Sequence, residues 1–481
     1  MEHSLNMPLV EAMINYKEQN VYPLHTPGHK GGRGMVQELQ GFWGDSLAME
    51  VSLMSELDDI HEPETYIKAG QQLAAELYGS DRCFWAVNGT SQAIHAMLMT
   101  ALKPGEKLLL PRNAHRSVAG GLILGGIEAV YLEPDFDCSW GLQQQITCEQ
   151  VMEALDKYED VKALLITSPN YYGVAAPVAK LAELCHSKGV LLLVDEAHGP
   201  HLGFSRLLPP SALQCGADAC AQSTHKLVGA MTQCSMLHVQ GKRLDLQRAA
   251  DIMSVLTTTS PNYFLMASLD AARAQLQANG VQMVERAVKA AQKLRRLCRE
   301  LGLRVLETDD CHGCALDITK VTVNVSDWGY DGVYVGDKLR QAGIAVELVD
   351  ACNVLFLVTY ADDNEDYEKA LLQIGKVLRQ LKQEKTAAGK ALAVPRLPVV
   401  QSGCSLRKVF NSPKESCSLE TAAGRICGEQ VSFYPPGIPV LLPGEIITAE
   451  TVEYCKEMKA LGLPVSGPAD TSLQTLRVLM R

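Results

Sequence analysis

An acid and a lysine follow two strand-like segments of the sequence, and their residue types suit covalent chemistry on an aldehyde. Asp195 comes directly after the apolar run from Val190 to Val194, and Lys226 ends the later sequence Ser223-Thr224-His225-Lys226. A lysine amine can hold an aldehyde as an imine, and a carboxylate can keep a pyridine nitrogen protonated so that the ring accepts electrons. The combination predicts a site for pyridoxal 5′-phosphate (PLP), in which Lys226 and Asp195 are catalytic.

Each of the two residues also has an ordinary explanation. A lysine next to a histidine is usually a solvated surface residue, and an aspartate that ends a strand is often only part of a turn or a helix cap. The PLP interpretation therefore depends on finding both residues together with a turn that could bind the phosphate of the cofactor.

Such a turn precedes a helix-like stretch in the first quarter of the sequence. Val87-Asn88-Gly89-Thr90-Ser91-Gln92 leads into the helix-like stretch from Ala93 to Leu102. Backbone N–H groups and hydroxyls gather at the start of a helix, which makes it a ready anion site. Capping of the helix by Asn, Thr or Ser is the alternative explanation. Together with the acid and the lysine, the turn predicts Thr90 and Ser91 as phosphate ligands.

Other side chains lie close to these motifs along the chain. His115 follows the strand-like segment from Lys107 to Leu110, where its ring could lie over the pyridine, although a histidine there is more often an ordinary loop residue. Ser223 and His225 are near enough to Lys226 to reach the phosphate and the imine, respectively. His225 could protonate the carbanion left after bond cleavage. Support of the loop through a hydrogen bond is the alternative explanation for His225.

The residues alone leave the reaction type open. The same imine can lose a proton, a carboxylate or a side chain, and the bond held perpendicular to the ring is the one that breaks. A transaminase usually binds the substrate carboxylate with an arginine, whereas a decarboxylase gains by leaving this group without a strong counter-charge. No clear arginine of that kind occurs near these motifs.

The composition is that of a soluble globular protein and argues against nucleic acid as a partner. The chain has 481 residues, of which 47% are hydrophobic and 21% charged, and its net charge is −11. A chain of this length is expected to form two or three domains. A negative net charge without a basic segment does not favour binding to phosphate backbones.

Neither the N-terminus nor the cysteines point to export or to a metal. Residues 1 to 20 carry acids and no sustained apolar region, and no apolar run approaches membrane-spanning length, so the protein is expected to be cytoplasmic. Cys311-His312-Gly313-Cys314 is the one CxxC sequence and lacks a second pair. We expect two free thiols in a loop there and predict no metal site.

The order of apolar segments predicts an α/β fold. Strand-like segments alternate with helical patterns in the first part of the chain, which favours a mostly parallel sheet covered by helices. The expected strands are Lys107 to Leu110, Ala163 to Thr167, Val190 to Val194 and Ser235 to Val239, and a long helix is expected from Ser268 to Leu301. The predicted domains are an N-terminal arm (1–45), a PLP-binding large domain (46–300), a small α+β domain (301–385) and a C-terminal domain (386–481).

Shorter elements are expected at both ends of the chain. Leu9, Met13 and Ile14 share one face of a short N-terminal helix. In the small domain, segments 315–325 and 354–359 are β-rich and Glu365 to Leu381 is helical. Residues 383–398 are expected to form a linker, and the last helix should run from about Thr448 to Leu461.

Together, these motifs resemble the bacterial Orn/Lys/Arg decarboxylase family, PLP enzymes with the aspartate aminotransferase fold (fold type I). The shared motifs are His25 to Gly31, Leu57 to Asp59, Asn88 to Ser91, Pro111 to Ser117, Val194 to Gly199, Ser223 to Lys226, Thr257 to Pro261, Pro435 to Pro439 and Pro443 to Glu445. They cover most of the chain in the order of the family. Since the His25 motif begins so early, the chain resembles the short biosynthetic branch, which lacks an N-terminal wing domain.

The resemblance implies roles for the matched residues. Lys226 would be the Schiff-base lysine, Asp195 would face the pyridine nitrogen and His115 would stack on the ring. The phosphate and its surroundings would be held by Thr90, Ser91, Ser223 and His225, and His198 is a further predicted cofactor-binding residue. Thr258 would reach the phosphate of the neighbouring subunit.

Two residues are predicted to bind the substrate. Glu445 would lie at the distal end of the pocket, where a carboxylate can bind an amine or a guanidinium. Capping of the C-terminal helix is the alternative explanation for Glu445. His29, in the Gly- and His-rich segment near the N-terminus, is the second predicted substrate-binding residue.

The resulting functional prediction is decarboxylation of a basic amino acid in polyamine biosynthesis. Arginine to agmatine is the first choice, and lysine to cadaverine or ornithine to putrescine are the alternatives. A PLP-dependent aminotransferase or lyase, and a non-catalytic homologue, are the other classes considered. The expected active unit is a homodimer or a dimer of dimers with shared sites, because the His25 motif and the hydroxyls at Thr257 to Thr259 would close a neighbour's pocket.

Overall fold

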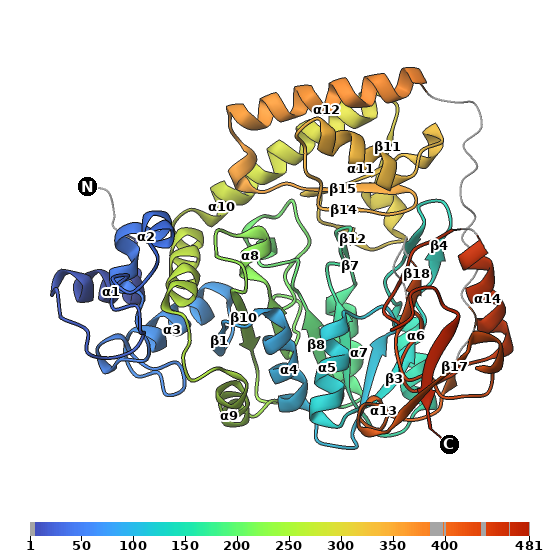
Figure 1. Cartoon of the computed structure of the whole chain (residues 1–481), viewed down its shortest axis with the longest axis horizontal. Coiled ribbons are helices and arrows are strands. Elements are labelled where there is room, and N and C mark those ends of the chain that lie inside the picture. The colour runs from blue at the N-terminus through green and yellow to red at the C-terminus, as the bar shows by residue number, and fades with distance from the viewer. Residues whose placement is uncertain (1–4, 385–397, 399–400, 434–438, 461, 481) are drawn as a thin grey trace. The chain divides into compact units, whose positions relative to one another are not determined.

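Short apolar segments form a seven-stranded sheet in the computed structural model, which describes residues 5–384, 398, 401–433, 439–460 and 462–480. The strand order is β1-β10-β9-β8-β6-β2-β3 (Figure 1). Their bounds are β1 Arg82–Ala86, β2 Lys107–Pro111, β3 Glu128–Leu132, β6 Val161–Thr167, β8 Leu191–Asp195, β9 Ala219–Gln222 and β10 Ser235–Val239. All four predicted strands are present, each within two residues of its expected bounds.

The sheet is mostly parallel, as predicted. Strand β2 pairs parallel with β3 and β6, and β8 pairs parallel with β9. Strand β10 runs antiparallel to its two neighbours, β1 and β9. Strands β2, β8, β9 and β10 read as near-continuous apolar runs because they are mostly buried on both faces, whereas the edge strand β3 is partly exposed.

The chain divides into two compact units. Unit 1 comprises residues 1–101, 165–168 and 178–284, and unit 2 comprises residues 102–164, 169–177 and 285–481. The helices of unit 1 are α1 Pro8–Glu18, α2 Gln37–Trp43, α3 Tyr66–Tyr78, α4 Gly89–Ala101, α7 Val178–Ser187, α8 Thr224–Leu227 and α9 Leu246–Leu256. Helix α10 (Tyr263–Glu300) begins in unit 1 and ends in unit 2.

Helix α4 begins earlier than the sequence predicts. The expected start was Ala93, whereas the helix begins at Gly89, so Thr90 and Ser91 lie in its first turn. Gly89 has φ +72°, a left-handed conformation that favours glycine. Helix α4 packs against β9 and β10 and alongside α9 (Figure 1).

The N-terminal helix is present, but its buried face differs from the prediction. Leu9 and Met13 are buried, together with Ala12 and Tyr16. Ile14 is 44% exposed and does not belong to the buried face. Spacings of three and four residues join Leu9, Ala12, Met13 and Tyr16 in one stripe, and Ile14 lies beside that stripe.

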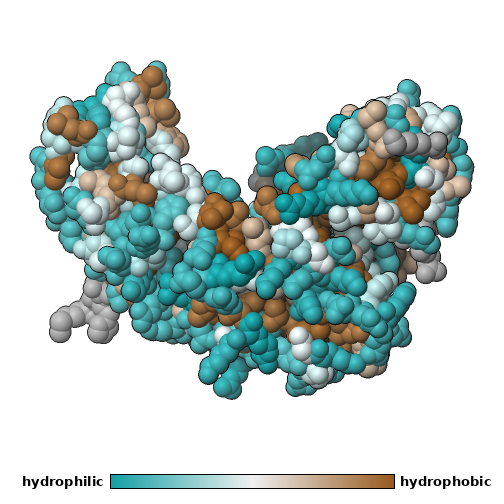
Figure 2. Space-filling model, turned by 90° about the horizontal axis from the view of Figure 1, so that it is seen from below, coloured by the Kyte–Doolittle hydropathy of each residue, from teal (hydrophilic) through white to brown (hydrophobic). Residues whose placement is uncertain are grey.

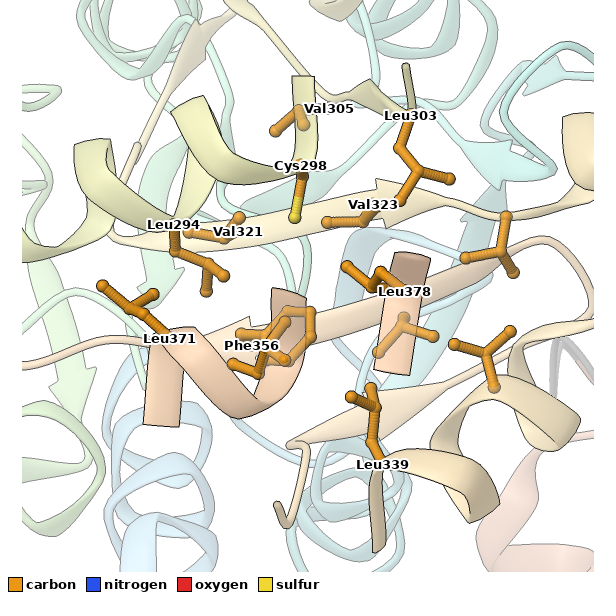
Figure 3. Close-up of a cluster of buried hydrophobic side chains, with 14 of the residues drawn as sticks. Leu294, Cys298, Leu303, Val305, Val321, Val323, Leu339, Phe356, Leu371 and Leu378 are labelled. Carbon is orange, nitrogen blue, oxygen red and sulfur yellow. The ribbon is translucent and has the colours of Figure 1, made fainter. Parts of the chain in front are cut away.

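The later part of unit 2 contains a four-stranded sheet with its own core. The strands β11 Arg304–Val305, β13 Lys320–Asn324, β15 Asn353–Leu357 and β14 Leu348–Val349 follow one another in that order. Figure 3 shows apolar side chains from these strands meeting those of α10, α11 (Gly332–Gln341) and α12 (Glu365–Glu384). The expected β-rich segments and the expected helix are therefore confirmed.

The last part of unit 2 is built from short paired strands. They are β16 Gln401–Ser402, β17 Lys414–Ser418, β18 Val431–Phe433, β19 Pro439–Leu441, β20 Glu445–Ile446, β21 Val465–Ser466 and β22 Thr475–Leu479. Helix α14 (Ala449–Ala460) agrees with the predicted last helix. Most of the predicted linker and residues 434–438 of the Pro435 motif lie outside the described residues. The domain boundaries stay a prediction.

The surface is mixed, and none of the described helices combines the length and the apolar character needed to cross a bilayer. Hydrophilic side chains predominate on the face in Figure 2, with smaller hydrophobic areas between them.

Candidate active site

Asp195 ends strand β8 and lies deep inside unit 1. Its side chain accepts a hydrogen bond from Ala197 N at 3.1 Å, and the residue is 2% exposed. Burial raises the pKa of Asp195 to about 6, although the bond from Ala197 and the charge of Lys226 act in the opposite direction. A buried carboxylate of this kind gains stability when a cationic N–H group is brought to it.

Lys226 lies in the short helix α8, which follows strand β9. Its Nζ is 3.0 Å from His198 Nε2. Lys226 and His198, which are both predicted site residues, are therefore in direct contact. The positive charge of Lys226 also acts to lower the pKa of Asp195.

His225 points its ring toward a backbone carbonyl. Its Nδ1 donates a hydrogen bond to Cys234 O at 2.8 Å, which assigns the proton to Nδ1 because a carbonyl only accepts. This hydrogen bond supports the loop, which is the alternative explanation for His225 given by the sequence. It leaves Nε2 as the ring atom that could exchange a proton, so the predicted catalytic role is compatible with the loop contact.

Three hydroxyls meet in the interior of unit 1. Thr90 Oγ1 is hydrogen-bonded to Ser223 Oγ and, at 2.6 Å, to Ser235 Oγ. All three residues are buried. Ser91, the next residue of helix α4, is exposed. The turn before the helix and the segment before the lysine are thus brought together, as the sequence predicts.

The side chains of unit 1 fit PLP by their chemistry. Besides the three hydroxyls, Thr224 Oγ1 is buried without a hydrogen-bond partner among the described residues. The first turn of α4 adds N–H groups that have no partner within the helix. Hydroxyl and N–H donors suit a phosphate, the carboxylate of Asp195 suits a pyridinium, and the amine of Lys226 suits an aldehyde.

Glu196 fixes the ends of β8 and β9 to each other. Its carboxylate accepts hydrogen bonds from Gln222 Nε2 at 2.7 Å and from Ala212 N at 2.6 Å. Burial raises the pKa of Glu196 to about 7. Since β8 ends in Asp195 and β9 leads to Lys226, this contact connects the two segments that carry the predicted catalytic residues.

The other predicted residues of unit 1 lie near the surface. His29 Nε2 is 2.7 Å from Glu50 Oε2, and its Nδ1 accepts from Gly32 N at 3.0 Å. Thr258 is exposed, and its hydroxyl accepts from Ser260 N at 3.2 Å. Neither residue contacts Lys226 in the described chain, so their predicted roles stay predictions.

His115 belongs to unit 2, where it precedes helix α5 (Arg116–Gly125). Its Nδ1 is 2.7 Å from Ser117 Oγ and accepts from Ser117 N at 3.3 Å, so the imidazole caps the helix. The residue is exposed. An N-cap fixes the position of the ring, and its stacking on the cofactor stays a prediction.

Glu445 forms a buried ion pair with Arg112 in unit 2. Arg112 Nη2 is 2.7 Å from Glu445 Oε2 and 3.1 Å from Val440 O. The two side chains are 3% and 5% exposed, and Glu445 also accepts from Leu442 N at 2.6 Å. Burial raises the pKa of Glu445 to about 7 against the opposing effect of Arg112. The pair fixes the segment from Val440 to Glu445 to the end of strand β2.

We expect Arg112→Met to destabilise the protein by about 3–5 kcal/mol, because it leaves the Glu445 carboxylate buried without a counter-charge. Thermal unfolding measures the loss. The matched control is Arg299→Met, which removes an arginine that is 3.1 Å from Glu307 in a pair whose side chains are 54% and 39% exposed. Loss of such a half-exposed pair should cost less than about 1 kcal/mol. Equal losses in the two variants would contradict the structural importance of the buried pair.

The CxxC sequence forms a turn in unit 2. Cys314 N donates to Cys311 O at 2.9 Å, and both residues carry free thiols. Burial raises the pKa of Cys311 to about 12. A thiol with so high a pKa is protonated at neutral pH and is a poor nucleophile or metal ligand.

Comparison with known proteins assigns the family. Residues 7–315 match the model of the Orn/Lys/Arg decarboxylase major domain, and residues 388–465 match the model of the C-terminal domain. The chain belongs to the Orn/Lys/Arg decarboxylase family. It is 40% identical to a Bacillus anthracis protein named arginine decarboxylase, over 98% of this chain and 97% of the relative. A Bacillus subtilis (strain 168) protein of the same name is 37% identical over the same shares of both chains.

The fold agrees with that assignment. Lysine decarboxylase A from Pseudomonas aeruginosa superposes with a TM-score of 0.86 at 20% sequence identity, over 99% of this chain and 81% of that chain. The predicted family and the predicted α/β fold of the aspartate aminotransferase type are confirmed.

Sequence reasoning missed three features of this Orn/Lys/Arg decarboxylase site. Ser235 was expected only as the start of a strand, since a serine there carries no signal of its own. Arg112 belongs to the motif from Pro111 to Ser117, but its ion pair with Glu445 was not predicted. The two residues are more than 300 positions apart in the sequence. The contact of His198 with Lys226 depends on how two strand ends meet, which spacing along the chain does not reveal.

Proposed function

We propose that the chain is a PLP-dependent decarboxylase that converts L-arginine to agmatine and CO₂. The observation that carries the proposal is the similarity, over nearly the full length, to two proteins named arginine decarboxylase. Lysine and ornithine are the alternative substrates, because a pocket for a guanidinium and a pocket for an ammonium differ only at their far end.

When bound, PLP supplies an electron sink for the bond that releases CO₂. Lys226 would hold the cofactor covalently, and Asp195 would keep its ring nitrogen protonated. The phosphate would be held by the hydroxyls of Thr90 and Ser223 and by the first turn of α4. His198 would line the same site. His225 would return a proton to the carbon that loses CO₂.

The remaining roles depend on the second unit and on a second subunit. We propose that His115 stacks on the cofactor ring and that Thr258 reaches the phosphate of a neighbouring subunit. His29 and Glu445 are proposed to contact the substrate. For Glu445, the ion pair with Arg112 has to open or to coexist with substrate binding. Cytoplasmic location and a role in polyamine synthesis belong to the same proposal.

One assay tests the reaction and the substrate together. Purified protein with added PLP is given arginine, lysine or ornithine, and CO₂ release is measured for each. The proposal expects the highest kcat/KM with arginine. A keto acid in place of CO₂ would favour an aminotransferase, and no reaction with any of the three would favour a non-catalytic homologue. The intact Lys226 and Asp195 argue against the last case.

A complementation experiment tests the shared site. We expect Lys226→Ala and Thr258→Glu subunits to be inactive separately, because one lacks the reacting amine and the other brings a carboxylate to a phosphate. After subunit exchange, about a quarter of wild-type activity should return, since half of randomly mixed dimers are hybrids with one intact site.

The control for complementation is Val255→Glu, which places the same carboxylate at a position of helix α9 that is 79% exposed and should remain active. If a mixture with proven exchange stays inactive, Thr258 acts within its own subunit and the shared-site prediction is wrong.

A further inference from the structure

The amine of Lys226 contacts an imidazole. His198 follows Asp195 in the turn after strand β8, and its Nε2 is 3.0 Å from Lys226 Nζ. His198 is 4% exposed, so the contact lies inside unit 1 rather than in solvent. A buried imidazole beside the reacting amine has a geometry suited to proton exchange.

The chemistry of Lys226 requires such an exchange. Only the neutral amine can attack the cofactor aldehyde, and with an ordinary lysine pKa about one amine in 10³ is neutral near pH 7.4. The same requirement returns in every turnover, when Lys226 has to bind the cofactor again as the product leaves.

We infer that His198 is a catalytic base for Lys226, an inference that rests on the proposed PLP chemistry. Neutral His198 takes one proton from the Lys226 ammonium on Nε2 and becomes an imidazolium. The neutral amine then forms a C=N bond with the aldehyde carbon. Its two remaining protons leave with the aldehyde oxygen as water, so no oxidant or reductant is needed. In the reverse direction His198 returns the proton to Lys226.

The other titratable groups around this contact are less suited to this proton. Nδ1 of His225 donates to Cys234 O. Asp195 faces the proposed position of the ring nitrogen, and the carboxylate of Glu196 already accepts from Gln222 and Ala212. Nε2 of His198 lies within hydrogen-bond distance of Nζ, at 3.0 Å.

The test separates cofactor binding from the covalent step. Cofactor-free wild type and His198→Gln are mixed with PLP, and the appearance of the visible absorbance band gives the rate of covalent attachment. Pyridoxamine 5′-phosphate has the same ring and phosphate but no aldehyde, so its dissociation constant reports the binding site alone. We expect attachment to slow by about 10²-fold or more in the variant, the usual scale of general base catalysis. Binding of pyridoxamine 5′-phosphate should be unchanged, which also proves that the variant is folded.

A second variant tests basicity itself. His198→Ala leaves room for an imidazole, and attachment should recover in proportion to added imidazole. His186→Gln is the matched control, because His186 is a partly buried histidine of unit 1 that pairs with Asp218 at 2.9 Å. It should attach PLP at the wild-type rate.

The outcomes are distinct. An unchanged attachment rate in His198→Gln, or equal loss of attachment and of pyridoxamine 5′-phosphate binding, would overturn the catalytic role of His198. Failure of the wild-type protein to attach PLP at Lys226 would instead overturn the proposed function.

Discussion

Replacing Lys226 by alanine is expected to abolish covalent attachment of PLP. The rate of decarboxylation should fall on the order of 10⁴-fold or more, as is usual when an enzyme loses the group that reacts covalently. The hydroxyls of Thr90 and Ser223, which we propose to hold the phosphate, remain in this variant, so cofactor should still bind without a covalent link. Lys226 is the lysine whose amine contacts His198 and whose charge acts on the buried Asp195.

Borohydride reduction followed by peptide mapping measures the attachment. In the wild type, the reduced adduct should be found on the peptide that contains Lys226. Lys242→Ala is the control, because Lys242 is an exposed lysine of the same unit and its loss should change neither the adduct nor turnover. An adduct on another lysine, or normal turnover in Lys226→Ala, would show that Lys226 is not the lysine that binds PLP covalently.

Local sequence patterns predicted the fold class. The strand before Asp195 is an unbroken aliphatic run, and such runs bounded by turns are the strongest signal that a sequence carries for a buried parallel strand. The meeting of Thr90 with Ser223 depends on strand β10, because the ends of β1 and β9 both lie beside the start of β10, where Ser235 stands. Neither β1 nor β9 is among the strands predicted from the sequence, so the proximity of Thr90 and Ser223 was implied only by the phosphate-binding role predicted for both.

The features that the sequence did not predict depend mostly on contacts between segments that are far apart in the chain. Nothing near Arg112 in the sequence indicates that its partner is Glu445, and the alternatives for Glu445, a substrate ligand or a helix cap, were both drawn from its local neighbours. Helix α4 begins at Gly89 and not at Ala93 because glycine can adopt the left-handed conformation at the first position, which helix propensity alone disfavours. Ile14 was predicted to be buried because it is next to Met13 on the helix. The buried face is narrower than that and does not include Ile14.

Replacing Asp195 by asparagine is expected to lower turnover on the order of 10²-fold or more, through loss of electrostatic stabilisation at the ring nitrogen. Asparagine keeps an oxygen that accepts from Ala197 N, so the turn after β8 should persist. The hydroxyls that we propose to hold the phosphate are unchanged in this variant, so cofactor should still bind. Turnover and PLP content of the purified variant measure the two effects separately, and near-normal turnover would mean that another residue faces the ring nitrogen.

The same substitution should stabilise the protein when no cofactor is bound. Burial raises the pKa of Asp195 from 3.8 to about 6, so between these values the folded protein binds a proton that the unfolded chain has lost. Stability therefore falls as the pH rises through this window, and a shift of about two pKa units corresponds to about 3 kcal/mol at neutral pH. Cofactor-free Asp195→Asn should unfold at a higher temperature than the cofactor-free wild type at pH 7, and this difference should vanish below about pH 4.

Thermal unfolding across that pH range checks the prediction. Lower stability of the variant at pH 7 would mean that contacts of the carboxylate outweigh its desolvation. Higher stability with lost turnover would show that the buried charge of Asp195 is unfavourable for the empty fold and is compensated only when a cationic ring binds beside it.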